Sequence, residues 1–267
     1  MSEPGPPRTL RPPVPVAVMA AVAALFLLLP LLALAVRTPW TDIGSLLGGE
    51  RVRQALRVSV IASTASLGLA TLLGVPLAWV LARGDFPGKR WLRAFATLPM
   101  VLPPVVGGVA LLLAYGRRGL VGESLADLTG VTIPFSMGAV VLAGAFVSMP
   151  FLVVTVEAAL RSADTRYEEA AASLGARRWY VFRRVTLPMS APALAAGMAL
   201  AWARALGEFG ATITFAGNLP GRTQTMPLAV FLELETDPEA AYLLSFLLLA
   251  VSVVVLVAMR GRAFGGR

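Results

Sequence analysis

Apolar residues occur along this chain in long runs rather than in short periodic clusters. The runs cover residues 15–36, 55–82, 94–115, 137–160, 193–215 and 241–259. A run of about 20 apolar residues, at about 1.5 Å per residue, is long enough to cross the hydrocarbon layer of a membrane as a helix. The pattern therefore predicts an all-α membrane protein with about six transmembrane helices.

Two of these runs are irregular. The second is long, so we expect it to tilt or to extend beyond the lipid. The third contains three prolines and two consecutive glycines, namely Pro99, Pro103, Pro104, Gly107 and Gly108. Such a helix is expected to be kinked or broken, which a membrane tolerates where protein packs around the break.

The segments outside the apolar runs are short. Residues 1–14 are rich in proline and are expected to form a disordered tail, residues 15–260 a single membrane domain, and residues 261–267 a second tail. A secretory signal is the alternative for the first run, because Arg8 and Arg11 precede it. The run has about 22 residues and exceeds the roughly 7–15 of a signal's apolar core, which favours a retained helix.

Basic residues are divided unequally between the two sets of loops that six spans create. With the N-terminus in the cytoplasm, fifteen lysines and arginines lie on the cytoplasmic side and six on the other. Cytoplasmic loops carry such an excess, so both termini are expected in the cytoplasm. The net charge of +8 is explained by these loops, and nucleic acid is not an expected partner.

The composition excludes several classes of function. Charged residues make up 14% of the chain and hydrophobic residues 57%, whereas a soluble domain carries about 25% charged residues. The surplus apolar surface is therefore expected to face a lipid bilayer. Neither cysteine nor histidine is present, which excludes disulfides, thiol redox chemistry and the usual zinc, haem and iron–sulfur ligand sets. No metal site, cofactor or catalytic residue is expected.

One glycine-rich stretch resembles a nucleotide-binding loop only superficially. The stretch from Gly84 to Arg90 is one residue short of a P-loop and lacks the serine or threonine that follows the lysine. We interpret it as a turn, so any energy from ATP would have to come from a partner subunit.

The loop over residues 162–189 contains the most informative pattern. Four residues with i, i+3, i+4, i+7 spacing share one face of a helix, namely Tyr167, Ala170, Ala171 and Leu174. Ser162 or Asp164 can cap the start of this helix, and Gly175 can end it in a left-handed conformation. A second, basic helical stretch is expected from Arg177 to Arg184. An amphipathic helix lying on lipid headgroups is one interpretation of this loop.

The same loop resembles the EAA motif of bacterial ABC importer permeases. Three residues separate Glu169-Ala170-Ala171 from Gly175, as in the motif. Nine further residues separate Gly175 from Val185-Thr186-Leu187-Pro188. The resemblance implies a type I importer permease without catalytic activity, whose cytoplasmic coupling helix docks on ABC ATPase subunits. It implies docking roles for Glu169, Ala170, Ala171 and Gly175, and the helical periodicity adds Tyr167 and Leu174.

Two further stretches resemble the molybdate and tungstate branch of that family. They are Leu98–Gly108 and Arg204–Pro220, the second followed by Thr223 and Pro227. The sulfate and thiosulfate permeases have similar stretches and remain an alternative. The resemblance implies a multi-pass protein of the bacterial cell membrane, a homodimer around one pore, and an extracytoplasmic oxyanion-binding protein that delivers the substrate.

Charged residues within the fifth run are candidates for the translocation pathway. Arg204 and Glu208 are four residues apart and so lie on one helix face, and charges inside a span are costly unless paired or facing water. We expect them, with Pro103 and Pro104, beside the pathway or its gate; an internal ion pair that fixes helix packing is the alternative. A secondary transporter driven by an ion gradient is the rival class, although no inverted repeat supports it.

Overall fold

The computed structural model describes residues 13–264, which fold into helices joined by short connections. The first half contains α1 (Val14–Arg37), the 3₁₀ turn η1 (Trp40–Asp42), α2 (Ile43–Gly48), α3 (Glu50–Arg83), α4 (Lys89–Val101), α5 (Pro104–Tyr115), α6 (Gly122–Thr129) and α7 (Met137–Ser162). The second half contains α8 (Arg166–Ser173), α9 (Arg178–Val181), η2 (Phe182–Thr186), α10 (Leu187–Met189), α11 (Ala191–Leu206), α12 (Gly210–Phe215), α13 (Met226–Thr236) and α14 (Pro238–Phe264).

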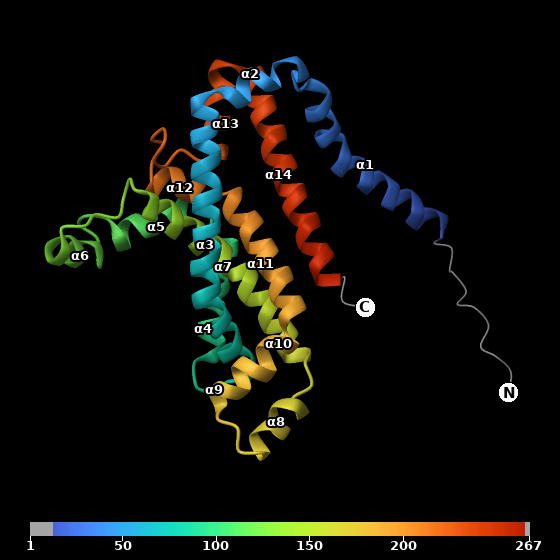
Figure 1. Ribbon diagram of the computed structural model, residues 1–267, viewed down its shortest axis with the longest axis vertical. Coiled ribbons are helices and arrows are strands. Elements are labelled where there is room, and N and C mark those ends of the chain that lie inside the picture. Colours follow the sequence, from blue (N-terminus) through green and yellow to red (C-terminus); the bar gives the residue numbers. More distant parts are fainter. Residues whose placement is uncertain (1–12, 265–267) are drawn as a thin grey trace.

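Helices α3, α7 and α11 form the centre of the bundle (Figure 1). Small residues on α3 let the backbones approach closely, as is usual between membrane helices, and Ala62, Ser66 and Ala70 are all buried. The Ser66 hydroxyl donates a hydrogen bond to the Val141 carbonyl of α7 at 2.9 Å. The alanine- and serine-rich sequence of α3 thus explains its close packing against α7.

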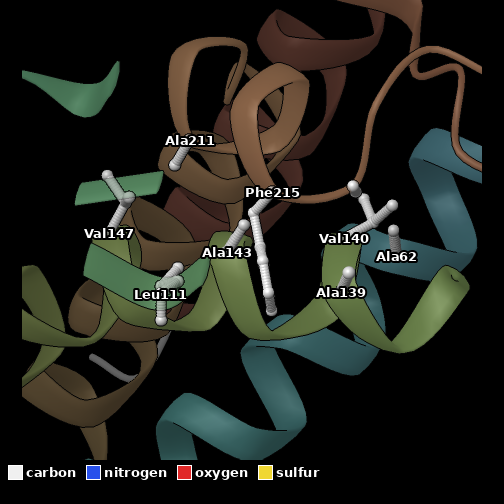
Figure 2. Packing of buried hydrophobic residues seen from close by; sticks show 9 residues of the cluster. Ala62, Leu111, Ala139, Val140, Ala143, Val147, Ala211 and Phe215 are labelled. Carbon is white, nitrogen blue, oxygen red and sulfur yellow. The ribbon is translucent and has the colours of Figure 1, made fainter. Parts of the chain in front are cut away.

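A second core lies where α12 and α5 meet the first half of α7. Phe215 of α12 is fully buried there among small side chains of α7, and Figure 2 shows its ring lying between Ala143 and Ala139. Leu111 of α5 and Ala62 of α3 belong to the same cluster. This core joins two broken segments of the chain to the long helices.

Two predicted spans are broken helices in the structure. Four helices within the described part of the chain are long and apolar enough to cross a membrane, and there are up to six such spans if each of two bent pairs forms one. The third predicted span, 94–115, divides into α4 and α5, which are bent by 119°. The other bent pair is Arg178–Met189 with Ala191–Leu206, at 75°. The fifth predicted span, 193–215, is interrupted at a different place, since α11 ends at Leu206 and α12 begins at Gly210. The interruption lies between Gly207 and Gly210, and glycine is the residue type that allows such a break.

The first helix stands apart from the bundle. None of the residues of α1 is buried, and the helix contacts α14 (Figure 1). The last helix extends to Phe264, so the predicted tail 261–267 is partly helical. The predicted tail 1–14 falls almost wholly on residues 1–12, which, like 265–267, lie outside the described residues.

A π-helical turn joins α9 to α10. Across residues Phe182–Thr186 the backbone winds more widely than an α-helix, and the Leu187 amide donates to the Phe182 carbonyl, five residues earlier. The basic stretch predicted as one helix over 177–184 is therefore α9 followed by this turn. Such turns are rare and occur mostly at functional sites.

Candidate functional site

Helix α8 carries most of the predicted coupling residues and is defined by its two ends. The Asp164 carboxylate accepts a hydrogen bond from the Arg166 amide at 3.0 Å. At the other end Gly175 has φ of +83°. The Gly175 amide donates to Ala172 at 2.9 Å and the Ala176 amide to Ala171 at 3.1 Å, the paired bonds of a Schellman ending. The left-handed conformation predicted for Gly175 is confirmed.

Two large side chains with apolar surface are exposed on the predicted coupling face of α8 and at its end. Tyr167 is 62% exposed and Leu174 is 90% exposed, while Glu169 and Ala170 are exposed and Ala171 is half-buried. A shallow hollow beside them is lined by Ala171, Leu174, Gly175, Ala176, Arg177 and Tyr180. Exposed apolar side chains around a concave spot are typical of an interaction surface.

Glu168 connects α8 to the membrane helices, a role that sequence reasoning missed. Its carboxylate accepts hydrogen bonds from Arg83, at the end of α3, at 3.0 and 3.3 Å, and from the Thr186 hydroxyl at 2.9 Å. The side chains of Arg83 and Glu168 are 17% and 18% exposed. We call this group of three side chains the latch.

A second ionic cluster lies at the same end of the bundle. Glu157 of α7 forms ion pairs with Arg161 at 3.1 Å and with Arg93 of α4 at 2.7 Å. Arg93 also donates to the Leu81 carbonyl of α3 at 3.4 Å. Arg161 lies one helical turn after Glu157 on α7, and Arg93 extends this pair so that three helices are joined near their ends.

The four candidate pathway residues lie around two chain breaks that pack against each other. Pro103 and Pro104 form the break that precedes α5, and α5 packs along α12 (Figure 1). A Cβ atom on Gly210, the first residue of α12, would lie 2.8 Å from the Pro104 Cβ. Only glycine therefore allows the starts of α5 and α12 to come this close.

Arg204 and Glu208 lie immediately before α12. The Arg204 Nη1 atom lies 2.6 Å from the Glu208 Oε2 atom, so the two side chains form an ion pair. The pair lacks hydrogen-bond geometry, and Oε2 accepts no hydrogen bond from any described group. The other oxygen, Oε1, accepts from the Ala211 amide at 2.8 Å. Glu208 is buried, whereas the Arg204 side chain is 27% exposed. This arrangement holds the break in shape and leaves the guanidinium partly accessible.

The predicted residues thus form two separate groups. The residues around α8 lie at one end of the molecule, and the breaks before α5 and α12 lie near its middle (Figure 1). Helices α3, α7 and α11 run between the two levels. These helices therefore connect the α8 end to the level of the breaks.

Known sequences place the chain among transport proteins. The sequence model of the family described as binding-protein-dependent transport system inner membrane component matches residues 70–263. The chain is 48% identical over 243 residues to the molybdenum transport system permease protein of Mycobacterium tuberculosis, covering 91% of this chain and 92% of that protein. It is 37% identical to a sulfate transport system permease protein of Escherichia coli over 236 residues, covering 87% and 85%.

Solved structures with the same fold are membrane parts of importers. A bacterial ABC transporter that imports the acidic polysaccharide alginate aligns with a TM-score of 0.70 at 16% identity, covering 93% of this chain and 94% of that chain. A structure of a bacterial alginate transporter in complex with its periplasmic protein aligns at 0.72, covering 91% of each chain. At this identity the likeness concerns the fold.

Proposed function

The chain belongs to the family of binding-protein-dependent transport system inner membrane components, and we propose that it is the permease subunit of an ATP-driven importer of molybdate. The assignment of molybdate as the substrate is supported by the 48% identity to a molybdenum permease over 91% of the chain, compared with 37% identity to a sulfate permease. As a member of this family with several apolar helices, it is a multi-pass protein of the bacterial plasma membrane.

We propose that α8 docks on a cytoplasmic ABC ATPase. The exposed residues Tyr167 and Glu169 of α8, with Leu174 directly after it, support this role. Together they offer a soluble partner both apolar surface and a negative charge to bind. The chain itself holds no P-loop, so ATP would be hydrolysed by that partner. The orientation that follows puts α8 and both termini in the cytoplasm, in agreement with the basic loops.

The pathway is proposed to run beside the two breaks. Arg204 is the residue there with a partly accessible positive charge, and an oxyanion needs weak electrostatic attraction without tight binding in order to leave the pore again. Pro103, Pro104 and Glu208 would shape this region. The pore would lie between two copies of the chain, since the exposed apolar side chains of α5, such as Val105 and Leu113, are available for a partner helix.

The substrate is tested by uptake into vesicles. The permease is reconstituted with its ATPase and oxyanion-binding protein, ATP is enclosed, and entry of molybdate is measured with tungstate or sulfate as competitor. Molybdate uptake that requires ATP and is inhibited by tungstate more than by sulfate supports the proposal. Preferential uptake of sulfate would assign the chain to the sulfate group, and uptake without ATP would indicate a secondary transporter.

The docking role is tested by charge reversal. Glu169→Lys should abolish uptake and weaken co-purification of the ATPase, because the exposed carboxylate lies on the proposed docking face. Glu123→Lys is the matched control, since Glu123 is also exposed but lies on α6, away from α8. Equal effects of both reversals would contradict the docking role.

A further inference from the structure

Two groups of arginines at the α8 end of the molecule differ in whether a carboxylate pairs with them. Arg83, Arg93, Arg161 and Arg166 each form an ion pair with a carboxylate. The second group, which lies on α9 and η2 and consists of Arg178, Arg183 and Arg184, forms no ion pair with any side chain that the structure describes. Three exposed positive charges on two short turns, without a carboxylate partner among the described side chains, make this surface attractive to an anionic neighbour from outside the chain.

An apolar groove lies directly beside these arginines. It has a volume of about 470 Å³ and is formed between α3 and the α9–η2 segment. Its walls are Pro76, Trp79, Val80, Arg178, Trp179 and Phe182. Apart from the one arginine, these side chains present aliphatic and aromatic surface, which suits a hydrocarbon chain rather than a polar ligand.

A second hollow adjoins the groove and is basic. Its volume is about 240 Å³, and it is lined by Trp179, Tyr180, Arg183 and Arg184. Trp179 lines both spaces, with its ring stacked on Phe182 at 5.6 Å and the Arg183 guanidinium 5.7 Å from its centre. An apolar compartment and a cationic compartment therefore share one aromatic wall.

The groove lies at the depth of a membrane surface. The α3 side of the groove extends from Pro76 to Val80, within the apolar run. Val80 is three residues before Arg83, the last residue of α3, so this side of the groove lies within about 5–10 Å of the helix end. Trp179 and Tyr180 are 66% and 57% exposed. Exposed tryptophan and tyrosine at this level are typical of the boundary between lipid tails and headgroups.

We infer that the groove and the basic hollow together bind one anionic phospholipid of the cytoplasmic leaflet. An acyl chain occupies the groove, and the phosphate lies in the basic hollow, where Arg183 and Arg184 donate to it and Arg178 adds its charge from the rim. The choice of leaflet rests on the proposed function, because it takes the α8 end as cytoplasmic. Both the charge and the paired apolar and cationic spaces match an anionic phospholipid.

The inference is tested with the purified importer in nanodiscs of phosphatidylcholine, to which phosphatidylglycerol is added in increasing amounts. Bound phosphatidylglycerol is counted by native mass spectrometry. Since each arginine near an anionic lipid contributes about a fivefold gain in affinity, the variant R183Q/R184Q should bind about 25-fold more weakly. The control variant R117Q/R118Q removes two exposed arginines near the end of α5 and should bind as the wild type does.

A photoreactive residue at position 179 identifies the occupant directly. A cross-link to phospholipid supports the inference, and a cross-link to the ATPase would overturn it by showing that a protein covers the groove. Equal lipid binding by R183Q/R184Q and the control would overturn it as well. Lipid binding is measured in an assay that does not involve transport. A failure of the lipid inference is therefore distinguishable from a failure of the proposed molybdate uptake.

Discussion

The latch offers the sharpest test of how α8 acts on the membrane helices. Glu168→Gln keeps an oxygen that can accept from the Thr186 hydroxyl but removes the charge that Arg83 pairs with. At about 4 Å and an effective dielectric constant of about 20, the attraction between two unit charges is about 4 kcal/mol. Desolvation of side chains that are 17% and 18% exposed offsets most of it, which leaves an expected coupling of about 1–2 kcal/mol.

This coupling energy limits what the latch can contribute to transport. A partner can shift the membrane helices only by the difference in its interactions with their two states, and a loss of about 1–2 kcal/mol corresponds to a factor of about 5–30. Glu168→Gln should therefore lower the molybdate imported per ATP hydrolysed by about that factor. ATP hydrolysis itself should continue, because Glu168 is half-buried behind the exposed docking face.

The assay is a double-mutant cycle in proteoliposomes. Uptake and ATP hydrolysis are measured for Arg83→Gln, Glu168→Gln and both together, and the exchanged pair R83E/E168R should recover part of the loss. Asp164→Asn is the control, because its ion pair with Arg166 has side chains that are 46% and 85% exposed and should contribute little. The reasoning is refuted if the two single losses simply add, or if the exchanged pair is no better than either single variant.

Three further outcomes follow from the packing. Gly175→Ala should destabilise the end of α8 by about 1–2 kcal/mol, because φ of +83° disfavours any residue with a Cβ, and should therefore reduce co-purification of the ATPase. The control Gly68→Ala, with open space around its Cβ position, should leave co-purification unchanged. In Gly108→Ala the new methyl group would overlap the Thr214 hydroxyl, so uptake should fall while the ATPase still co-purifies. Phe215→Ala, in a fully buried position, should destabilise the permease by about 3–5 kcal/mol in a thermal unfolding assay.

Features that depend on neighbours in sequence could be predicted from the sequence. The ending of α8 at Gly175 follows from the conformational freedom of glycine. The ion pairs of Glu157 with Arg161 and of Arg204 with Glu208 follow from their spacing of four residues on a helix. In each case the geometry is set within one or two helical turns, so the pattern of residues is sufficient.

Features that join distant parts of the chain could not be predicted. Arg83 and Glu168 are 85 residues apart, and nothing local distinguishes Glu168, which faces the membrane helices, from Glu169, which is exposed. The break between α11 and α12 was only partly predictable. Gly207 and Gly210 indicate that the helix can be interrupted there, but the packing of Gly210 against Pro104 joins distant parts of the chain and could not be predicted.

The π-helical turn at 182–186 makes the length of this segment as important as its composition. Such a turn accommodates one residue more than an α-helical turn does. Removing a single residue there would restore ordinary winding, rotate everything on the N-terminal side by about 100° and displace it by about 1.5 Å relative to α11. Tyr167 and Leu174 would then point away from their present direction with their chemistry intact, so a deletion in this segment should abolish docking even where every remaining side chain is unchanged.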